Sequence, residues 1–172
     1  RDGCTLNALN GEYKGDGNLY KSANGVALGT EQGNALYFSN GRELSALLAQ
    51  CGEYAALYAC GAVTLDSAFA LPYGAGMVID GGNSLTLAPG ASLTCTGNIW
   101  VNGGALTVSD GANITFGNAA ARIWANAEDG SSVTGQGLDS ITVRYTKRGV
   151  NSQADMDAAF GGAYSDEIIH II

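Results

Sequence analysis

The sequence predicts an all-β fold: a parallel β-helix, or solenoid, with a short amphipathic capping helix and an irregular N-terminal β segment. Two repeats, and the glycines between them, indicate this fold. In the first repeat, residues 84–95 can be laid over residues 105–116 at one constant offset, so that Leu85 matches Leu106. A period of about 20 to 25 residues is typical of a solenoid coil, in which each repeat is one turn of a wound ribbon.

A four-residue strand pattern forms the second repeat, at residues 77–80, 99–102 and 123–126. Because strand side chains alternate between two faces, the apolar first and third residues point inward and the second points outward. Stacked coils place equivalent residues about 4.8 Å apart and bury a core that one coil cannot form alone. The fourth residue is Asp or Asn in every copy, and such side chains hydrogen-bond to neighbouring turns at coil corners. Glycines supply the tight bends at these corners: Gly81, Gly82, Gly90, Gly103, Gly104 and Gly111.

Residues 1–38 form the predicted N-terminal β-rich segment. Residues 18–21 and 26–28 flank an Asn-Gly turn and predict a hairpin, and residues 35–38 predict a further strand. A bare terminal coil would expose strand edges and core residues. We therefore expect this segment to cap or flank the solenoid.

Residues 39–149 are predicted to contain the capping helix and the coils. The helix is expected at residues 41–50, where three leucines share one face, with Ser39 or Asn40 as its N-cap. We expect this helix to cover the first coil. Strands of early, irregular coils follow at residues 57–65 and 68–71, and regular coils at residues 77–146.

Residues 150–172 echo the capping helix and the strand after it. Residues 38–48 resemble residues 150–160 at an offset of 112, and the apolar run 167–172 follows. This segment is either the start of a further repeat or a C-terminal piece whose last strand adds to the final coil. The first alternative predicts a longer chain with adjoining copies of the same unit.

Composition restricts the class of protein. Of 172 residues, 26 are Gly and 2 are Pro, and 46 % are hydrophobic, which favours many tight turns between strands over disorder. The net charge is −8, without a basic patch, which argues against nucleic acid and anionic membrane surfaces as partners. The longest apolar run is too short to span a bilayer. Because the chain starts at Arg1, we expect a mature or excised fragment of a longer protein, and because only 14 % of it is charged, we expect that protein to be extracellular.

The four cysteines do not have the spacing of a metal site, and we predict no bound metal and no cofactor. Cys51 and Cys60 could close a small disulfide loop worth about 2 to 3 kcal/mol; the alternative is two buried free thiols. Cys95 has the alternation of a core residue, so we expect a buried thiol. Cys4 then has no evident partner.

The helix pattern Ser-x-x-(Asp/Glu)-Leu-x-x-Ala-Leu, followed by a strand and Gly/Asn-rich coils, resembles the right-handed parallel β-helix modules of secreted bacterial surface proteins, of the pectate-lyase-like kind. The resemblance covers residues 38–149, with a weaker copy from residue 150. It implies a secreted or cell-surface bacterial protein, such as an adhesin or a glycan-handling module. The enzymes of this family have long solenoids with constellations of carboxylates and basic residues.

Candidate ligand-binding residues are Trp100, Trp124 and Arg122. Both tryptophans occupy the outward position of the four-residue pattern, so stacked coils would form a flat aromatic ladder beside Arg122. Such a face suits a glycan or a protein of a host or cell surface. The alternative is that the N-terminal segment or residues 150–172 cover both rings.

A catalytic site is not predicted. A glycosidase or lyase needs paired carboxylates, or calcium with a base, and the acidic residues are scattered: Asp66, Asp80, Asp110, Glu128, Asp129 and Asp139. The leading hypothesis is a non-catalytic module for adhesion, display or glycan contact. The alternatives are a fragment of a polysaccharide-acting enzyme and a structural spacer in a tandem array.

Overall fold

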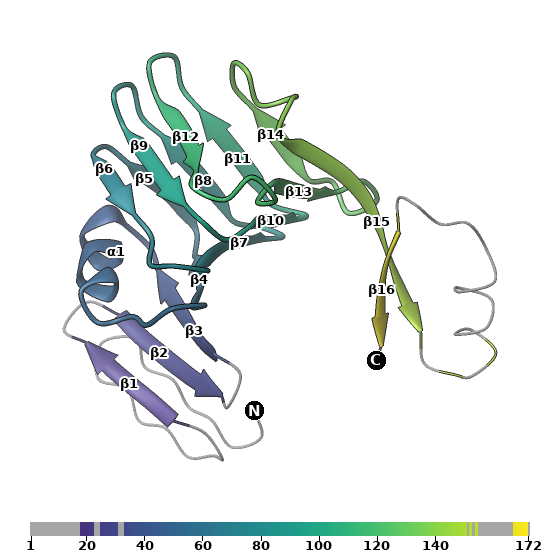
Figure 1. The fold of residues 1–172 in the computed structure, drawn as a ribbon, viewed down its shortest axis with the longest axis horizontal. Helices are drawn as coiled ribbons and strands as arrows, with labels where there is room; N and C mark the ends of the chain where they lie inside the picture. The colour runs from purple at the N-terminus through teal and green to yellow at the C-terminus, as the bar shows by residue number, and fades with distance from the viewer. Residues whose placement is uncertain are drawn as a thin grey trace.

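The computed structural model describes residues 18–22, 25–30, 33–150, 152, 154 and 167–171. It is a parallel β-solenoid in which each complete coil has three short strands joined at three corners (Figure 1). Equivalent strands of successive coils pair in parallel, and they form three faces. Face 1 contains β4 (Ala56–Ala59), β7 (Gly76–Asp80), β10 (Ile99–Asn102), β13 (Ile123–Asn126) and β15 (Thr142–Val150).

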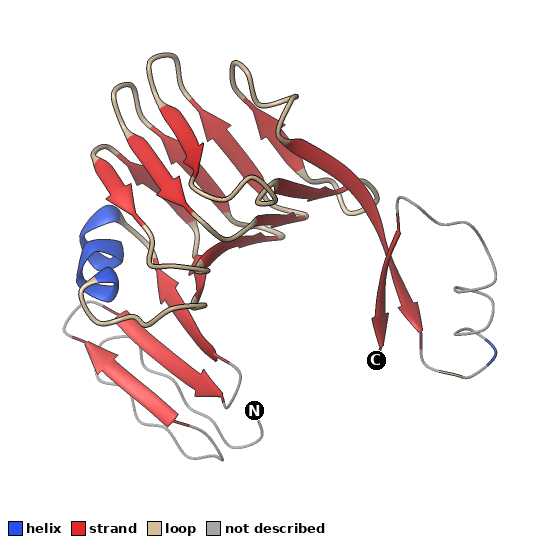
Figure 2. Cartoon of the chain, in the orientation of Figure 1, coloured by secondary structure: helices blue, strands red, loops and turns tan. Residues whose placement is uncertain are grey.

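The other two faces are shorter. Face 2 contains β5 (Ala62–Leu65), β8 (Ser84–Leu87), β11 (Ala105–Val108) and β14 (Ser132–Thr134). Face 3 contains β6 (Ala68–Ala70), β9 (Ser92–Cys95) and β12 (Asn113–Phe116). Figure 2 shows how the loops at the corners connect the strands of the three faces.

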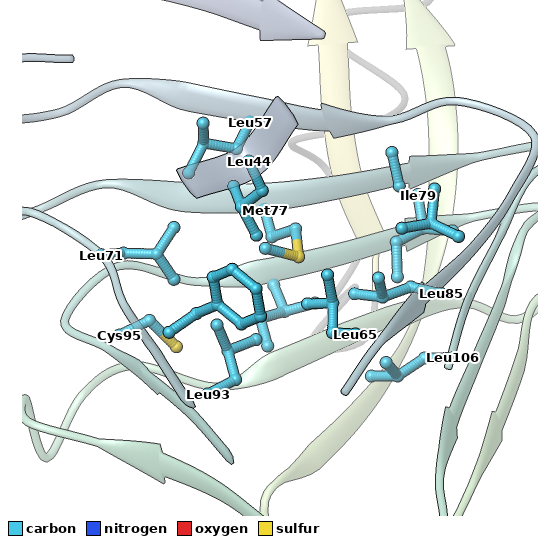
Figure 3. Packing of buried hydrophobic residues seen from close by; sticks show 14 of the residues in the cluster. Leu44, Leu57, Leu65, Leu71, Met77, Ile79, Leu85, Leu93, Cys95 and Leu106 are labelled. Carbon is cyan, nitrogen blue, oxygen red and sulfur yellow. The ribbon is translucent and has the colours of Figure 1, made fainter. Parts of the chain in front are cut away.

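The predicted stacking of the coils is confirmed. Leu85 pairs with Leu106 across face 2, in parallel and in register. Leu93 pairs with Ile114 in the same way across face 3. Inward residues of the central coils, such as Leu85 and Leu93, are completely buried, and Figure 3 shows several of them packed together inside the coils. A fully buried Leu or Ile contributes about 1.5 to 3 kcal/mol, so this core supplies most of the stability.

The expectation that residues before Met77 form irregular coils is wrong. Strands β4, β5 and β6 make a complete first coil, and Val63 pairs in register with Leu85. The repeat is hard to see in the sequence because the corners differ in length. Leu57 lies 20 residues before its partner Met77, whereas Phe69 lies 24 residues before Leu93. The corners between paired strands therefore differ in length from one coil to the next.

The capping helix, α1 (Gly41–Leu48), closes the N-terminal end of the solenoid, as predicted. The strand before it, β3 (Gly33–Phe38), pairs in parallel with β4, so α1 takes the place that faces 2 and 3 occupy in later coils. Leu44 and Leu47 of α1 are buried in the common core. A Cβ atom on Gly41 would lie 3.1 Å from the ring of Phe69, which shows how closely α1 covers the first coil.

Replacing Asn40 with alanine is expected to lower the free energy of unfolding by about 1 kcal/mol. The Glu43 N–H donates to Asn40 Oδ1 (2.9 Å), and the Ser39 N–H and hydroxyl donate to the Glu43 carboxylate (2.7 Å each). This reciprocal capping satisfies donors that a helix start leaves unpaired. Urea unfolding measures the change. Asn113→Ala, at an exposed strand position, is the control and should stay within about 0.5 kcal/mol of the unchanged protein; equal losses would contradict the capping role.

The N-terminal segment extends face 1. The predicted hairpin is confirmed: β1 (Asn18–Ser22) and β2 (Gly25–Thr30) pair antiparallel, and β2 pairs antiparallel with β3. The two connecting residues, 23 and 24, lie outside the described residues. Together with the five strands of face 1 and the C-terminal strand β16 (Glu167–Ile171), these strands form a nine-stranded sheet that curves away from the solenoid body at both ends (Figure 1).

At the C-terminal end, β15 takes part in two pairings. Its first residues pair with β13, and Thr146–Val150 pair in parallel with β16 (Glu167–Ile171). This second pairing reproduces the β3–β4 register at an offset of 112, since Leu36 pairs with Leu57 and Arg148 pairs with Ile169. The final strand thus adds to the sheet of face 1. The helix expected at residues 150–160 lies largely outside the described residues.

The far end of the solenoid is more open than the end under α1. In the described part of the fourth coil, residues 135–141 stand where a third strand would be, and they bury Leu138. Among the described residues, β12 and β14 are the last strands of their sheets. The inward side chains of β12, Ile114 and Phe116, are only partly buried.

Candidate functional site: an aromatic row on face 1

Large outward side chains of the coils lie on face 1. Its register brings four aromatic residues, with Val78 between the two pairs, into one row across the strands, which we call the aromatic row: Tyr37, Tyr58, Trp100 and Trp124. The outward positions of faces 2 and 3 hold only Ala, Ser, Thr and Asn: Ala62, Thr64, Ala68, Ala70, Ser84, Thr86, Ser92, Thr94, Ala105, Thr107, Asn113, Thr115, Ser132 and Thr134. The two kinds of face therefore differ sharply in chemistry.

The rings of the aromatic row stack in two pairs. Trp100 and Trp124 have ring centroids 5.5 Å apart with 19° between their planes, and Tyr37 and Tyr58 are 5.0 Å apart with 24° between theirs. The outward stacking predicted for the tryptophans is present, but the ladder is not flat. Neighbouring strands lie about 4.8 Å apart, which is less than the width of a ring, so adjacent rings overlap face to face. Trp100 and Trp124 are half-buried.

Sequence reasoning missed Tyr145, which comes from β15 and covers part of the row. Its ring meets Trp100 edge-on at 5.9 Å and Trp124 at 6.2 Å, and only 4 % of the residue is exposed. Its hydroxyl donates to Asn102 Oδ1. Burial, followed by the nearby charges of Asp129 and Asp80, raises the pKa of Tyr145, so the phenol keeps its proton and remains a donor.

One polar group of the aromatic row has no hydrogen-bond partner in the described part of the chain, although it is buried. The indole N–H of Trp124 is buried and has no hydrogen-bond partner within the described ranges. A buried donor without a partner costs about 1 to 3 kcal/mol. The predicted alternative, in which the N-terminal segment or residues 150–172 cover the tryptophans, depends mostly on residues outside the described ranges.

A group of polar residues borders the aromatic row at the corner between faces 1 and 2. Asn102 Nδ2 donates to Asp80 Oδ1 (3.2 Å) on the preceding coil, which confirms the expected contact between Asx side chains of neighbouring coils. Asn126 Nδ2 donates to Asp129 Oδ2 (2.7 Å), and the Ser131 hydroxyl lies 2.7 Å from Asp129 Oδ1. This polar border offers hydroxyl and carboxylate groups beside the rings.

Arg122 lies on the other side of the row, two residues before Trp124. Its Nη1 donates to the carbonyl oxygens of Ala119 (2.6 Å) and Ala121 (2.7 Å), and its backbone N–H donates to Asn98 Oδ1 (2.9 Å). The contacts of the Arg122 side chain are thus to the loop before β13, and its expected role beside the tryptophans stays a prediction. These hydrogen bonds stabilise that loop.

The Cys51–Cys60 disulfide is not formed, and both residues carry free thiols. Cys51 follows the C-terminal end of α1, whereas Cys60 follows β4 and lies near Glu43 in the first turn of α1. Opposite ends of an eight-residue helix are about 12 Å apart, and a disulfide needs Cα atoms within about 7 Å. Burial raises the pKa of both thiols. It raises the pKa of Cys95 to about 12, as expected for a thiol in the core.

The acidic residues remain dispersed, except that Asp80 and Asp129 both lie close enough to Tyr145 to affect its pKa. Each of these two carboxylates accepts hydrogen bonds from the polar border. Over the residues that the structure describes, no group of three or more His, Cys, Asp and Glu side chains could hold a metal ion. In that same part of the chain, no helix is long and apolar enough to cross a membrane.

Fold and site together define a class: a parallel β-solenoid protein with a short capping helix and one aromatic face. Compared with protein-family models, curated proteins and solved structures, the chain has no match in any of the three.

Proposed function

We propose that this chain is a non-catalytic module of a secreted or surface-attached bacterial protein, and that its face 1 contacts glycans. One observation carries the proposal: large outward rings of the coils lie on face 1, while faces 2 and 3 present small side chains. A β-solenoid needs no outward aromatic residue for its own core. Among the residues of the strands, their restriction to one face favours a role in recognition.

The chemistry of face 1 suits a sugar ligand. Aromatic rings offer apolar surface to the C–H groups of a sugar ring, and the polar border supplies hydroxyl and carboxylate groups for its hydroxyls. From Tyr37 to Trp124 the row crosses four strand spacings, about 19 Å, which is long enough for a short oligosaccharide. The net charge of −8 disfavours acidic glycans, so the preferred ligand is neutral.

Binding of neutral oligosaccharides tests this proposal. The two tryptophans of the chain both lie in the aromatic row, so a titration followed by tryptophan fluorescence reports on face 1. Cellohexaose, mannohexaose and chitohexaose are the probes. We expect one of them to change the emission, and we expect Trp100→Ala to weaken its binding at least about tenfold, since stacked aromatic contacts dominate such sites.

Thr86→Ala is the matched control, because Thr86 is an outward residue of face 2. It should bind as tightly as the unchanged protein. Circular dichroism verifies that each variant is folded, and Tyr37→Ala tests the other end of the row if Trp100→Ala is unstable. A folded Trp100→Ala/Trp124→Ala variant that keeps its affinity in calorimetry would reject face 1 as the site.

A structural spacer in a tandem array is the second candidate function. The equal registers of β3–β4 and β15–β16, at an offset of 112, favour it. A spacer would bind none of the probes, and its partners would be adjoining copies of the unit. The enzymatic alternative has a separate test: incubation with neutral and acidic polysaccharides, followed by assays for new reducing ends and unsaturated products.

A further inference from the structure

Two exposed tyrosines lie outside the aromatic row, at the corner that leads from face 3 into face 1. Tyr54 and Tyr73 are 62 % and 59 % exposed, and no other large hydrophobic side chain in the described residues is as open. They belong to neighbouring coils. Their ring centroids are 5.7 Å apart and their planes meet at 85°, so the two rings form a right angle at the surface.

The backbone at Tyr54 is strained. Its φ is 60°, and it is the one described residue other than glycine with a positive φ. A bulky residue in this region costs about 1 to 2 kcal/mol, and such strain is found where function requires it. Other corners use glycine at positive φ, for example Gly61 and Gly82. This corner therefore has a tyrosine where glycine would be the less costly residue.

Neighbouring coils hold the pair in place. The Tyr54 N–H donates to the Tyr73 carbonyl (2.9 Å), and the Gly74 N–H donates to Thr96 Oγ1 (2.7 Å). The Tyr54 ring lies against Gly74, where an added Cβ atom would come within 2.4 Å of it. Three successive coils thus fix the rings before any ligand arrives, which lowers the entropy lost on binding.

We propose that the Tyr54–Tyr73 pair is a second stacking subsite for a neutral sugar ring. The inference depends on the proposed glycan-binding function. A protein partner is a poor fit, because stable protein interfaces bury about 800 Å² per partner and the described surface has no further large exposed apolar side chain to extend the patch. A single sugar ring needs only one or two aromatic surfaces. The exposed carboxylate of Glu53, adjacent in sequence, can accept hydrogen bonds from sugar hydroxyls.

The pair is positioned to share one ligand with the aromatic row. Tyr54 precedes Tyr58 by four residues, so the two residues lie at most about 13 Å apart along the chain. The outward position between them on β4, Ala56, carries a small side chain, whereas at its partner Gly76 the carbonyl oxygen of Asn98 lies 2.5 Å from the place of an added Cβ atom. A linear oligosaccharide can therefore reach from the corner to the row along β4, past Ala56.

Tyr54→Gly tests the subsite with the hexasaccharide that changes the tryptophan emission. This variant removes the ring and the strain together, so we expect the melting temperature to stay within about 4 °C while binding weakens at least about fivefold. In protein with labelled tyrosine rings, we expect the NMR signals of Tyr54 and Tyr73 to shift on titration. Tyr73→Phe, which keeps its ring, should bind like the unchanged protein.

The outcomes separate this inference from the proposed function. Tryptophan emission that responds with unchanged affinity in Tyr54→Gly and Tyr73→Ala overturns the subsite and leaves face 1 as the binding site. Tyrosine shifts without a tryptophan response support the subsite and contradict binding at the aromatic row. Absence of both signals with all three hexasaccharides overturns both proposals. A melting temperature lowered by more than about 8 °C in Tyr54→Gly shows that the ring is structural and also overturns the subsite.

Discussion

Replacing Leu93 with alanine should lower the free energy of unfolding by about 3 to 4 kcal/mol. Leu93 lies in the second of the stacked coils and is fully buried, with Phe69 before it and Ile114 after it in face 3. Coils on both sides hold the surrounding residues in place, so the cavity cannot collapse. The cost then includes both the lost transfer free energy and the cavity term.

An alanine at the paired position one coil later, Ile114, provides the control. Ile114→Ala should cost about half as much, because Ile114 is already partly exposed at the open end of the solenoid. Unfolding in guanidinium chloride, with equal m-values for both variants, measures the difference. Equal losses would mean that another part of the chain covers the end of face 3.

The second large effect is expected for Gly104→Ala, which should cost about 3 kcal/mol. Gly104 is buried at the corner after β10. An added Cβ atom would lie 2.5 Å from the carbonyl oxygen of Ile79 and 2.8 Å from that of Asp80. Both obstacles are backbone atoms of the preceding coil, so the two coils must move apart and weaken the pairing next to the polar border.

Gly52→Ala is the control for this substitution. Nothing lies within 4 Å of the position that its Cβ would take, and its φ is ordinary. It should leave stability unchanged or raise it by up to about 1 kcal/mol, because alanine restricts the unfolded chain. Thermal unfolding of the two variants gives the comparison, and a Gly104→Ala protein as stable as Gly52→Ala would show that the coils have room to separate.

The stacked core and the cap could be predicted from the sequence because both depend on local patterns. Alternation of apolar and polar residues placed Leu85 and Leu106 inside the coils, and the leucines of α1 with their N-cap identified the helix. Solenoid coils contact only their neighbours, so a repeat that is visible in the sequence translates directly into contacts. Trp100 and Trp124 were recognised for the same reason.

The rest of the site depends on corner lengths and backbone angles, which the sequence does not reveal. Tyr37 and Tyr58 join the aromatic row because corners of unequal length still bring the strands into register. Tyr145 reaches the tryptophans from a coil that diverges from the repeat. The positive φ of Tyr54 has no signature in composition, since glycine is the residue that such an angle usually predicts.

The unequal ends of the solenoid give its unfolding a direction. At one end, α1 closes the core; at the other, within the described residues, the side chains of Ile114 and Phe116 are only partly buried. Because each coil contacts only its neighbours, coils unfold one after another from the less stable end of the solenoid. Amide protons of β12 and β14 will therefore exchange sooner than those of β5 and β8, because the coils at the open end unfold first.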